Sequence, residues 1–164
     1  MKTISTVLIL GLLAASCSQV SRHPTDEALI QNFTAHRVEF QELVAMIQAD
    51  KGLRRIDDNW TDPTDPSTIG VSPERIADYR KRFAVCGIPR GFYSFQSGSN
   101  INFIATAFGL CTGGSGKGYA YLSTPPPSSD IVPSTDAYRT TRRGAYRVYR
   151  HVEGNWYIEY DFDD

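Results

Sequence analysis

The spacing of apolar residues changes once along the chain, near Ile88, and this change most constrains the fold. Before it, apolar residues recur at spacings of three and four, which predicts amphipathic helices. After it, short segments rich in Tyr, Phe, Ile and Val are separated by turn signals, which predicts β-strands. Helices first and antiparallel strands afterwards predict an α+β domain, with two helices packed on one antiparallel sheet of about five strands in two layers.

Two segments before Ile88 have helical periodicity. The first begins near Pro24, has Asp26 and Glu27 in its first turn, and ends before Gly52. Proline in the first turn and acidic side chains near the positive helix end both favour this start. Its apolar stripe comprises Leu29, Phe33, His36, Phe40, Leu43, Val44 and Ile47. The second helix is predicted from its cap, its stripe and its final glycine, namely Ser72, Pro73, Glu74, Ile76, Tyr79, Phe83 and Gly87.

Five later segments are predicted to be strands, at residues 91–95, 101–110, 118–122, 145–152 and 155–161. The intervening residues 96–100, 112–116 and 153–155 are predicted to be turns. Two longer loops are rich in proline, at residues 57–70 and 125–136.

The chain has 164 residues, with 17 basic and 18 acidic side chains and a formal net charge of −1. This length fits one domain of ordinary size. A balanced charge gives no reason to expect a nucleic-acid partner. After residue 17, no segment is long and apolar enough for a membrane helix.

The N-terminal segment indicates export. Lys2 precedes an apolar run at residues 4–15, which is too short to span a bilayer, and small residues follow. The sequence Leu12-Leu13-Ala14-Ala15-Ser16-Cys17 resembles the lipobox of bacterial lipoproteins. That resemblance implies cleavage before Cys17 and several acyl chains on Cys17, which together give a permanent anchor. A plain signal peptide cut nearby, with Cys17 incidental, is the alternative.

The sequence is therefore divided into a signal peptide at residues 1–16, a tether at 17–24 and a single α+β domain at 25–164. Ser18 follows the cysteine, and no Asp stands there to resemble an inner-membrane retention signal. The expected location is the bacterial envelope, at the periplasmic side of an outer membrane where the cell has one.

Two further cysteines, Cys86 and Cys111, are predicted to form a disulfide, because an isolated pair in an oxidising envelope usually does so. The alternative is a cysteine nucleophile with His36 or His151, although no flanking sequence resembles a nucleophile motif. No cofactor is expected. No metal site is expected either, because these two cysteines and the three histidines show no paired ligand spacing.

Two motifs suggest a ligand but fail on their residues. The glycine-rich sequence at 112–118 does not match a phosphate loop. That motif requires glycine at position 111, which is Cys111, and Ser or Thr at position 118, which is Gly118. The segment that follows also reads as a strand rather than a helix. The acidic loop has Asp57, Asp58, Asp62 and Asp65 but lacks the glycine and final Glu of an EF-hand, so we interpret it as turns.

A basic and aromatic concentration gives the candidate binding residues. It comprises Arg139, Arg142, Arg143, Arg147 and Arg150, interleaved with Tyr138, Tyr146, Tyr149 and His151. On a strand, Arg147, Tyr149 and His151 share one face. Tyr and Arg are enriched where interfaces concentrate binding energy, so these three residues are predicted to contact a partner. A solvated sheet face with cross-strand aromatic packing is the alternative.

Three segments resemble a family of small exported bacterial proteins of unknown function. They are Ile69-Gly70-Val71-Ser72-Pro73-Glu74-Arg75, Lys117-Gly118-Tyr119-Ala120-Tyr121-Leu122 and Tyr149-Arg150-His151-Val152-Glu153-Gly154-Asn155-Trp156-Tyr157. The resemblance implies a shared domain and transfers no catalytic residue.

The function expected from these observations is a lipid-anchored, non-enzymatic module that binds a protein or an envelope polymer. A specialised version is an immunity or inhibitor protein for an exported toxin. The alternative is a small envelope hydrolase that uses His36 or His151 with carboxylates; for His36 as a general base, the carboxylate would be Glu39 or Glu42.

Overall fold

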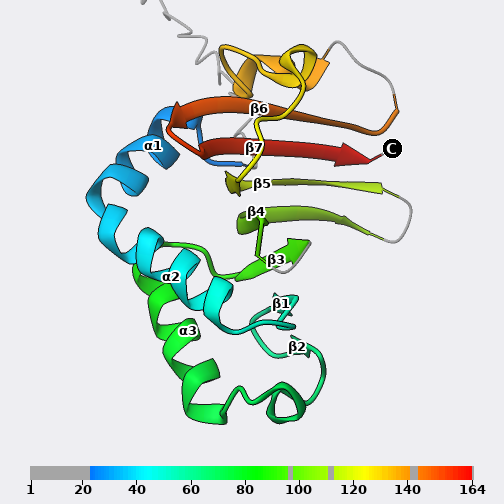
Figure 1. Ribbon diagram of the computed structural model, residues 1–164. Helices are drawn as coiled ribbons and strands as arrows, with labels where there is room; N and C mark the ends of the chain where they lie inside the picture. Colours follow the sequence, from blue (N-terminus) through cyan, green and yellow to red (C-terminus); the bar gives the residue numbers. More distant parts are fainter. Residues whose placement is uncertain (1–22, 96–97, 111–112, 141–143, 164) are drawn as a thin grey trace, which may run out of the picture.

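The structure is a computed structural model that describes residues 23–95, 98–110, 113–140 and 144–163. Over these residues, three helices pack against one antiparallel sheet of seven strands in the order β2-β1-β3-β4-β5-β7-β6 (Figure 1). The strands are β1 (Arg55–Ile56), β2 (Thr61–Asp62), β3 (Phe92–Phe95), β4 (Asn100–Leu110), β5 (Gly113–Leu122), β6 (Tyr146–Glu153) and β7 (Trp156–Asp163). The predicted α+β class and the antiparallel sheet are confirmed. The predicted numbers of two helices and about five strands are wrong.

The first predicted helix is two helices, α1 (Asp26–Ala35) and α2 (Arg37–Ala49). His36 lies between them with φ −119° and ψ 28°, outside the helical region. The change in direction allows Phe33 and Phe40 to pack in the same core, where their rings lie 5.4 Å apart. Tertiary packing therefore interrupts a segment whose local periodicity is continuous.

The third helix, α3 (Pro73–Val85), begins where the sequence predicted. The Ser72 hydroxyl accepts a hydrogen bond from the Arg75 amide at 3.2 Å, and Pro73 occupies the first turn. Short 3₁₀ helices lie at Pro66–Ile69, Ser128–Asp130 and Asp136–Thr140. No helix in the described part of the chain is long and apolar enough to cross a membrane.

Two differences in the sheet matter for the site. The two-residue strand β1 ends just before the region predicted to be a loop at residues 57–70, and β2 lies inside it, so that part of the loop prediction is wrong. Arg55 of β1 also pairs with Tyr93 of β3. Strands this short show no alternation that a sequence pattern can reveal. Strand β5 begins at Gly113 rather than at residue 118, because its glycines pair with β4 on one side and β7 on the other.

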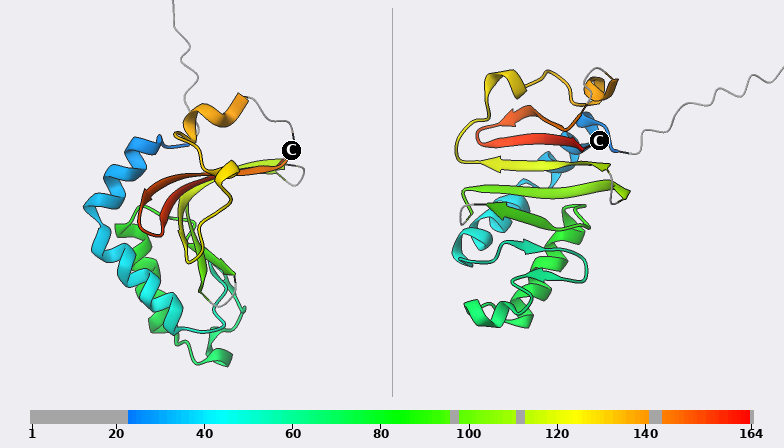
Figure 2. Two further views of the ribbon diagram at one scale, coloured as in Figure 1. Left: turned by 45° about the horizontal axis from the view of Figure 1, so that its top comes forward. Right: turned by 90° about the vertical axis from the view of Figure 1, so that its right-hand side faces the viewer.

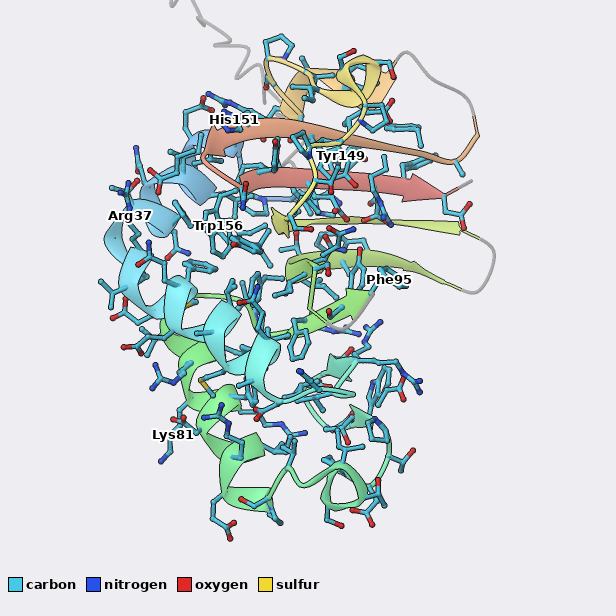
Figure 3. All side chains as sticks on the ribbon, in the orientation of Figure 1. Arg37, Lys81, Phe95, Tyr149, His151 and Trp156 are labelled. Carbon is cyan, nitrogen blue, oxygen red and sulfur yellow. The ribbon has the colours of Figure 1, made fainter. Side chains whose placement is uncertain are left out.

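The helices cover one face of the sheet, as the left view of Figure 2 shows. The core between the two layers is aromatic, and Phe40 lies within 6 Å of the rings of Tyr119, Phe103 and Trp156. Figure 3 shows Trp156 directed into this layer. The opposite face is called the open face below; its residues include Tyr93, Asn102, Gly116, Arg147 and Glu159, and the right view of Figure 2 looks onto it.

A buried ionic network joins the start of α1 to β5. The Lys117 side chain is 2% exposed, and its ammonium nitrogen lies 2.8 Å from Asp26 and 2.6 Å from Asp136. Burial would raise the pKa of Asp26, but hydrogen bonds from Lys117 and Thr135 outweigh it and lower that pKa to about 2. Lys117 lies in strand β5, and the carboxylates of Asp26 and Asp136 balance its buried charge.

Candidate functional site

The open face contains a cleft of about 480 Å³ over β4 and β5. The end of the cleft near β1 and β3 has Arg55, Arg90 and Tyr93. The wall on β7 has Glu159, Asp161 and Asp163, which lie two residues apart and therefore share one face. Basic and acidic groups thus line opposite sides of one hollow.

Glycines form the floor of the cleft. Gly114, Gly116 and Gly118 alternate along β5, so all three face the open side. A Cβ on Gly118 would lie 1.9 Å from the carbonyl oxygen of Phe103, so this glycine permits the close approach of β5 to β4. A Cβ on Gly116 would lie 2.5 Å from Oδ1 of Asp161. The Asp161 carboxylate therefore leans over the space that Gly116 leaves.

Glu159 is the central acidic group of the cleft, and the residue is 5% exposed. Its Oε1 accepts a hydrogen bond from the Tyr93 hydroxyl at 3.0 Å and lies 3.5 Å from Nε of Arg147. Burial raises the pKa of Glu159 to about 7, against the opposing attraction of Arg147. Burial likewise raises the pKa of the neighbouring Asp161. The cleft therefore contains two carboxyl groups that ionise less readily than usual.

Two oxygen atoms at the cleft lack a hydrogen-bond partner within the described residues. They are Oε2 of Glu159 and Oδ1 of Asn102, and both residues are 5% exposed. Buried polar atoms are normally paired, so two unpaired acceptors at one cleft are unusual.

The basic end of the cleft is organised by Asp57, which is 1% exposed. Its carboxylate accepts hydrogen bonds from Arg55 at 2.7 Å and from Arg90 at 3.1 Å. Burial acts to raise the pKa of Asp57, but bonds from Arg55 and the Asp58 amide lower it overall. The Arg55 guanidinium also lies 4.8 Å from the centre of the Trp60 ring. Asp57 thus holds two arginines. Separately, the described residues contain no group of three or more His, Cys, Asp or Glu side chains able to hold a metal ion.

The structure places the three predicted binding residues on the open face, opposite residues of β7. Arg147 pairs with Asp161, Tyr149 with Glu159 and His151 with Tyr157. Arg147 contacts the cleft through Glu159, and Tyr149 packs on Tyr157 with ring centres 6.1 Å apart. His151 lies at the strand end, where its ring nitrogen is 3.0 Å from the Gly154 carbonyl oxygen (Figure 3). A binding role for these three residues remains a prediction.

The other predicted site residues lie elsewhere. His36 is half-buried at the break between α1 and α2, and neither it nor His151 lines the cleft. Cys86 is buried at the end of α3, and burial raises the pKa of its thiol to about 12. Cys17 and Cys111 lie outside the described residues, as do Arg142 and Arg143. Lipid attachment at Cys17 and the Cys86–Cys111 bond therefore stay predictions.

The comparisons with known proteins add no relationship: no family model matches the chain, and neither a curated protein nor a solved structure does. The sequence analysis did not identify Tyr93, Asn102, Glu159 or Asp161 as site residues. One signal could have found the cleft. Glycine at every second position from 114 to 118, beside strands with acidic residues, predicts a strip of sheet without side chains.

Proposed function

We propose that this protein is a lipid-anchored protein of the bacterial envelope that acts as a non-enzymatic binding module, with the open-face cleft as its binding site. The pair of unpartnered acceptors, Glu159 Oε2 and Asn102 Oδ1, is the observation that carries this proposal. Leaving such atoms buried and unpaired costs roughly 1 to 3 kcal/mol each, more for a charged group, and a bound ligand would recover that cost.

The charge arrangement supports the same location. Arg147 adjoins the cleft through Glu159, and Tyr149 lies beside it on the same face. Arginine and tyrosine contribute strongly to binding where they are partly desolvated. The side chain of Arg147 is 42% exposed, so it can contact both Glu159 and a partner that covers the cleft.

The experiment is affinity capture from native envelopes, with the intact lipoprotein as bait. We expect the Arg147→Ala/Tyr149→Ala variant to retain its fold and to lose at least tenfold of the captured partner. Lys81→Ala is the matched control, because Lys81 is exposed on α3, on the helix side of the molecule (Figure 3). Full capture by the folded double variant would contradict this location, and unfolding would show that the two residues are structural.

The anchor has its own test. Mass spectrometry of the membrane fraction should find an N-terminal peptide that begins at a diacylglyceryl-modified Cys17. An unmodified mature chain that begins at another residue would contradict the lipoprotein assignment.

A small envelope hydrolase is the second candidate, and one observation favours it. Glu159 is a buried carboxyl group with a pKa near neutrality beside Asp161, as general acids often are. The cleft has no described histidine lining it, so this version would depend on carboxylates rather than on His36 or His151. Release of a cleaved product from an envelope polymer by the wild type, and not by Glu159→Gln, would favour hydrolysis over binding.

A further inference from the structure

We infer that the open-face cleft binds a neutral oligosaccharide, whose hydroxyl groups pair with Arg55, Asn102 and Glu159 and whose sugar rings stack on aromatic rings beside the cleft. This inference rests on the proposed function and names the chemical class of its ligand. The observations that support it are the mixed type and wide spread of the unpaired polar atoms, the balance of charge and an exposed aromatic strip.

The unpaired polar atoms of the cleft include a donor as well as acceptors. Nε of Arg55 is a donor, whereas Oδ1 of Asn102 and Oε2 of Glu159 are acceptors, and none of the three has a partner within the described residues. All three residues line the cleft, and the end groups of Asn102 and Glu159 turn readily about their last side-chain bond. A hydroxyl group donates one hydrogen bond and accepts two, so a single kind of group pairs with all three atoms. It also pairs with the Glu159 carboxyl group whether that group is ionised or protonated.

The three residues are spread across the sheet. Arg55 is on β1, Asn102 on β4 and Glu159 on β7, and the strand order puts four steps between the first and the last. Neighbouring strands are about 4.8 Å apart, so these steps cover roughly 19 Å. No small group reaches that far. The ligand is therefore an extended molecule that lies across the strands and carries hydroxyl groups along its length.

The balance of charge indicates a neutral ligand. Within the described residues, three basic and three acidic side chains line the cleft, namely Arg55, Arg90, Lys117, Glu159, Asp161 and Asp163. Both arginines are held by Asp57, and Lys117 is paired with Asp26. A strongly anionic or cationic polymer would meet as many like charges as opposite ones, whereas an uncharged sugar chain meets no repulsion.

The position of the cleft favours a sugar chain over a peptide. The cleft lies over β4 and β5, and each of these strands pairs with a neighbour on both sides. An added peptide strand needs a free sheet edge, where it forms main-chain hydrogen bonds. The middle of the sheet offers no such edge, so recognition depends on side chains.

An aromatic strip borders the cleft at β1 and β3 and comprises Trp60, Tyr93 and Phe95. The Tyr93 and Phe95 rings lie 5.5 Å apart, and the Arg55 guanidinium lies 4.8 Å from the centre of the Trp60 ring and 6.0 Å from that of Tyr93. Phe95 is 58% exposed and Trp60 45% exposed. Figure 3 shows Phe95 at the end of β3, away from the helices. The negative face of an aromatic ring attracts the polarised C–H groups of a sugar, so the strip provides a stacking surface beside the polar groups.

The test uses the mature full-length lipoprotein in a detergent without a sugar head group, and calorimetric titration measures binding. The probes are the hexasaccharides of β-linked glucose, α-linked glucose and β-linked N-acetylglucosamine, each with its own monosaccharide as the control. We expect at least one hexasaccharide to bind at least tenfold more tightly than its monosaccharide, because the polar groups are spread over several sugar residues. Absence of binding by all three hexasaccharides, or equal affinity for hexamer and monomer, would overturn the inference.

Variants locate the site. Phe95→Ala should weaken hexasaccharide binding about five- to tenfold, because it removes an exposed stacking ring. Val38→Ala is the matched control and should leave binding unchanged, because Val38 is 62% exposed on α2, which covers the opposite face of the sheet. Asn102→Leu should weaken binding to a similar extent without lowering the free energy of unfolding, because it replaces an unpaired buried oxygen by an apolar group. Unchanged affinity in either folded variant would overturn the inference.

A salt series on the wild type provides a readout that does not depend on the folding of a variant. Salt screens the attraction between charges and has little effect on a neutral ligand. Raising the salt concentration from about 0.05 M to about 0.5 M should therefore change the affinity for the hexasaccharide by less than about twofold. A tenfold loss over this range would show that charge carries the binding and would overturn the inference.

Two further arms separate a sugar chain from a peptide and this inference from the proposed function. An uncharged octapeptide of alternating serine and glycine is the peptide control, and the inference is wrong if it binds as tightly as the hexasaccharides. If the sugars fail but Arg147→Ala/Tyr149→Ala still loses its captured partner, the oligosaccharide inference is wrong and the binding module stands. Failure of both would overturn both.

Discussion

Tyr93 and Glu159 lie on strands separated by two others, and yet the Tyr93 hydroxyl donates a hydrogen bond to Oε1 of Glu159 at 3.0 Å. The register places Gly118 and Ala120 on β5 beneath this contact. Their small size leaves the space that the tyrosine ring crosses. The contact encloses a carboxyl group on the open face of the sheet, and burial raises the pKa of Glu159 to about 7.

The first prediction follows from this pKa. The folded-state value is above the unfolded one, so the folded protein binds the proton more tightly and its free energy of unfolding falls as pH rises from about 4.5 to about 7. The loss is about 3 kcal/mol. Glu159→Gln cannot ionise, so it should equal the wild type at pH 4 and exceed it by about that amount at pH 8. Denaturant unfolding at the two pH values measures this, and parallel stabilities of the two proteins would contradict it.

The second prediction concerns the glycine floor. Gly118→Ala should destabilise the fold by about 3 kcal/mol, because its Cβ would collide with the backbone oxygen of Phe103. Gly116→Ala should cost about 1 kcal/mol, because its Cβ meets the Asp161 side chain, which can rotate away. Thermal unfolding of the two variants compares them directly. Equal losses would show that β5 is not paired as described.

The fold class was predictable from sequence, because it depends on the periodicity of apolar residues along the chain. The cleft was not predictable, since it depends on how the strands pair across the sheet. Alternation along residues 145–152 correctly separates Arg147 from the buried Val148. No local pattern reveals that Tyr93 would reach Glu159 across two strands. Nor does one show that Asp57 would bind Arg90, since both contacts are set by the order of strands in the sheet.

The same distinction explains the elements that sequence analysis missed. The break at His36 is imposed by the shared core of Phe33 and Phe40, which local periodicity does not encode. The glycines at the start of β5 have low strand propensity, so the segment was predicted to be a turn. Pairing on both sides overrides that propensity.

The third prediction concerns the cysteines. Cys86 and Cys111 should be bonded in the exported protein, and Cys86→Ser should then lose about 2 to 4 kcal/mol of stability. Thiol labelling must follow unfolding without reduction, because Cys86 is buried and burial raises its thiol pKa to about 12. Two labelled thiols in the exported domain would exclude the bond.

The fourth prediction concerns the buried pair Asp26 and Lys117, which lie 2.8 Å apart. Removing one partner leaves the other charge incompletely paired in the interior, so Asp26→Asn and Lys117→Met should each cost about 3 kcal/mol. The double variant should cost less than the sum of the two, and a double-mutant cycle by denaturant unfolding measures the coupling. Glu27→Gln, at an exposed position on the same helix, should change stability by less than about 1 kcal/mol.

Acid titration gives an independent check on this pair. The folded-state pKa of Asp26 is lowered to about 2 from an ordinary value of 3.8. The stability it contributes is therefore complete above about pH 4 and is lost as pH falls towards 2, an amount of about 2 kcal/mol. Asp26→Asn should remove this part of the acid dependence while it leaves the decline between pH 4.5 and 7 that Glu159 causes. If the variant and the wild type lose stability equally between pH 4 and pH 2, Lys117 does not hold Asp26 in its ionised form.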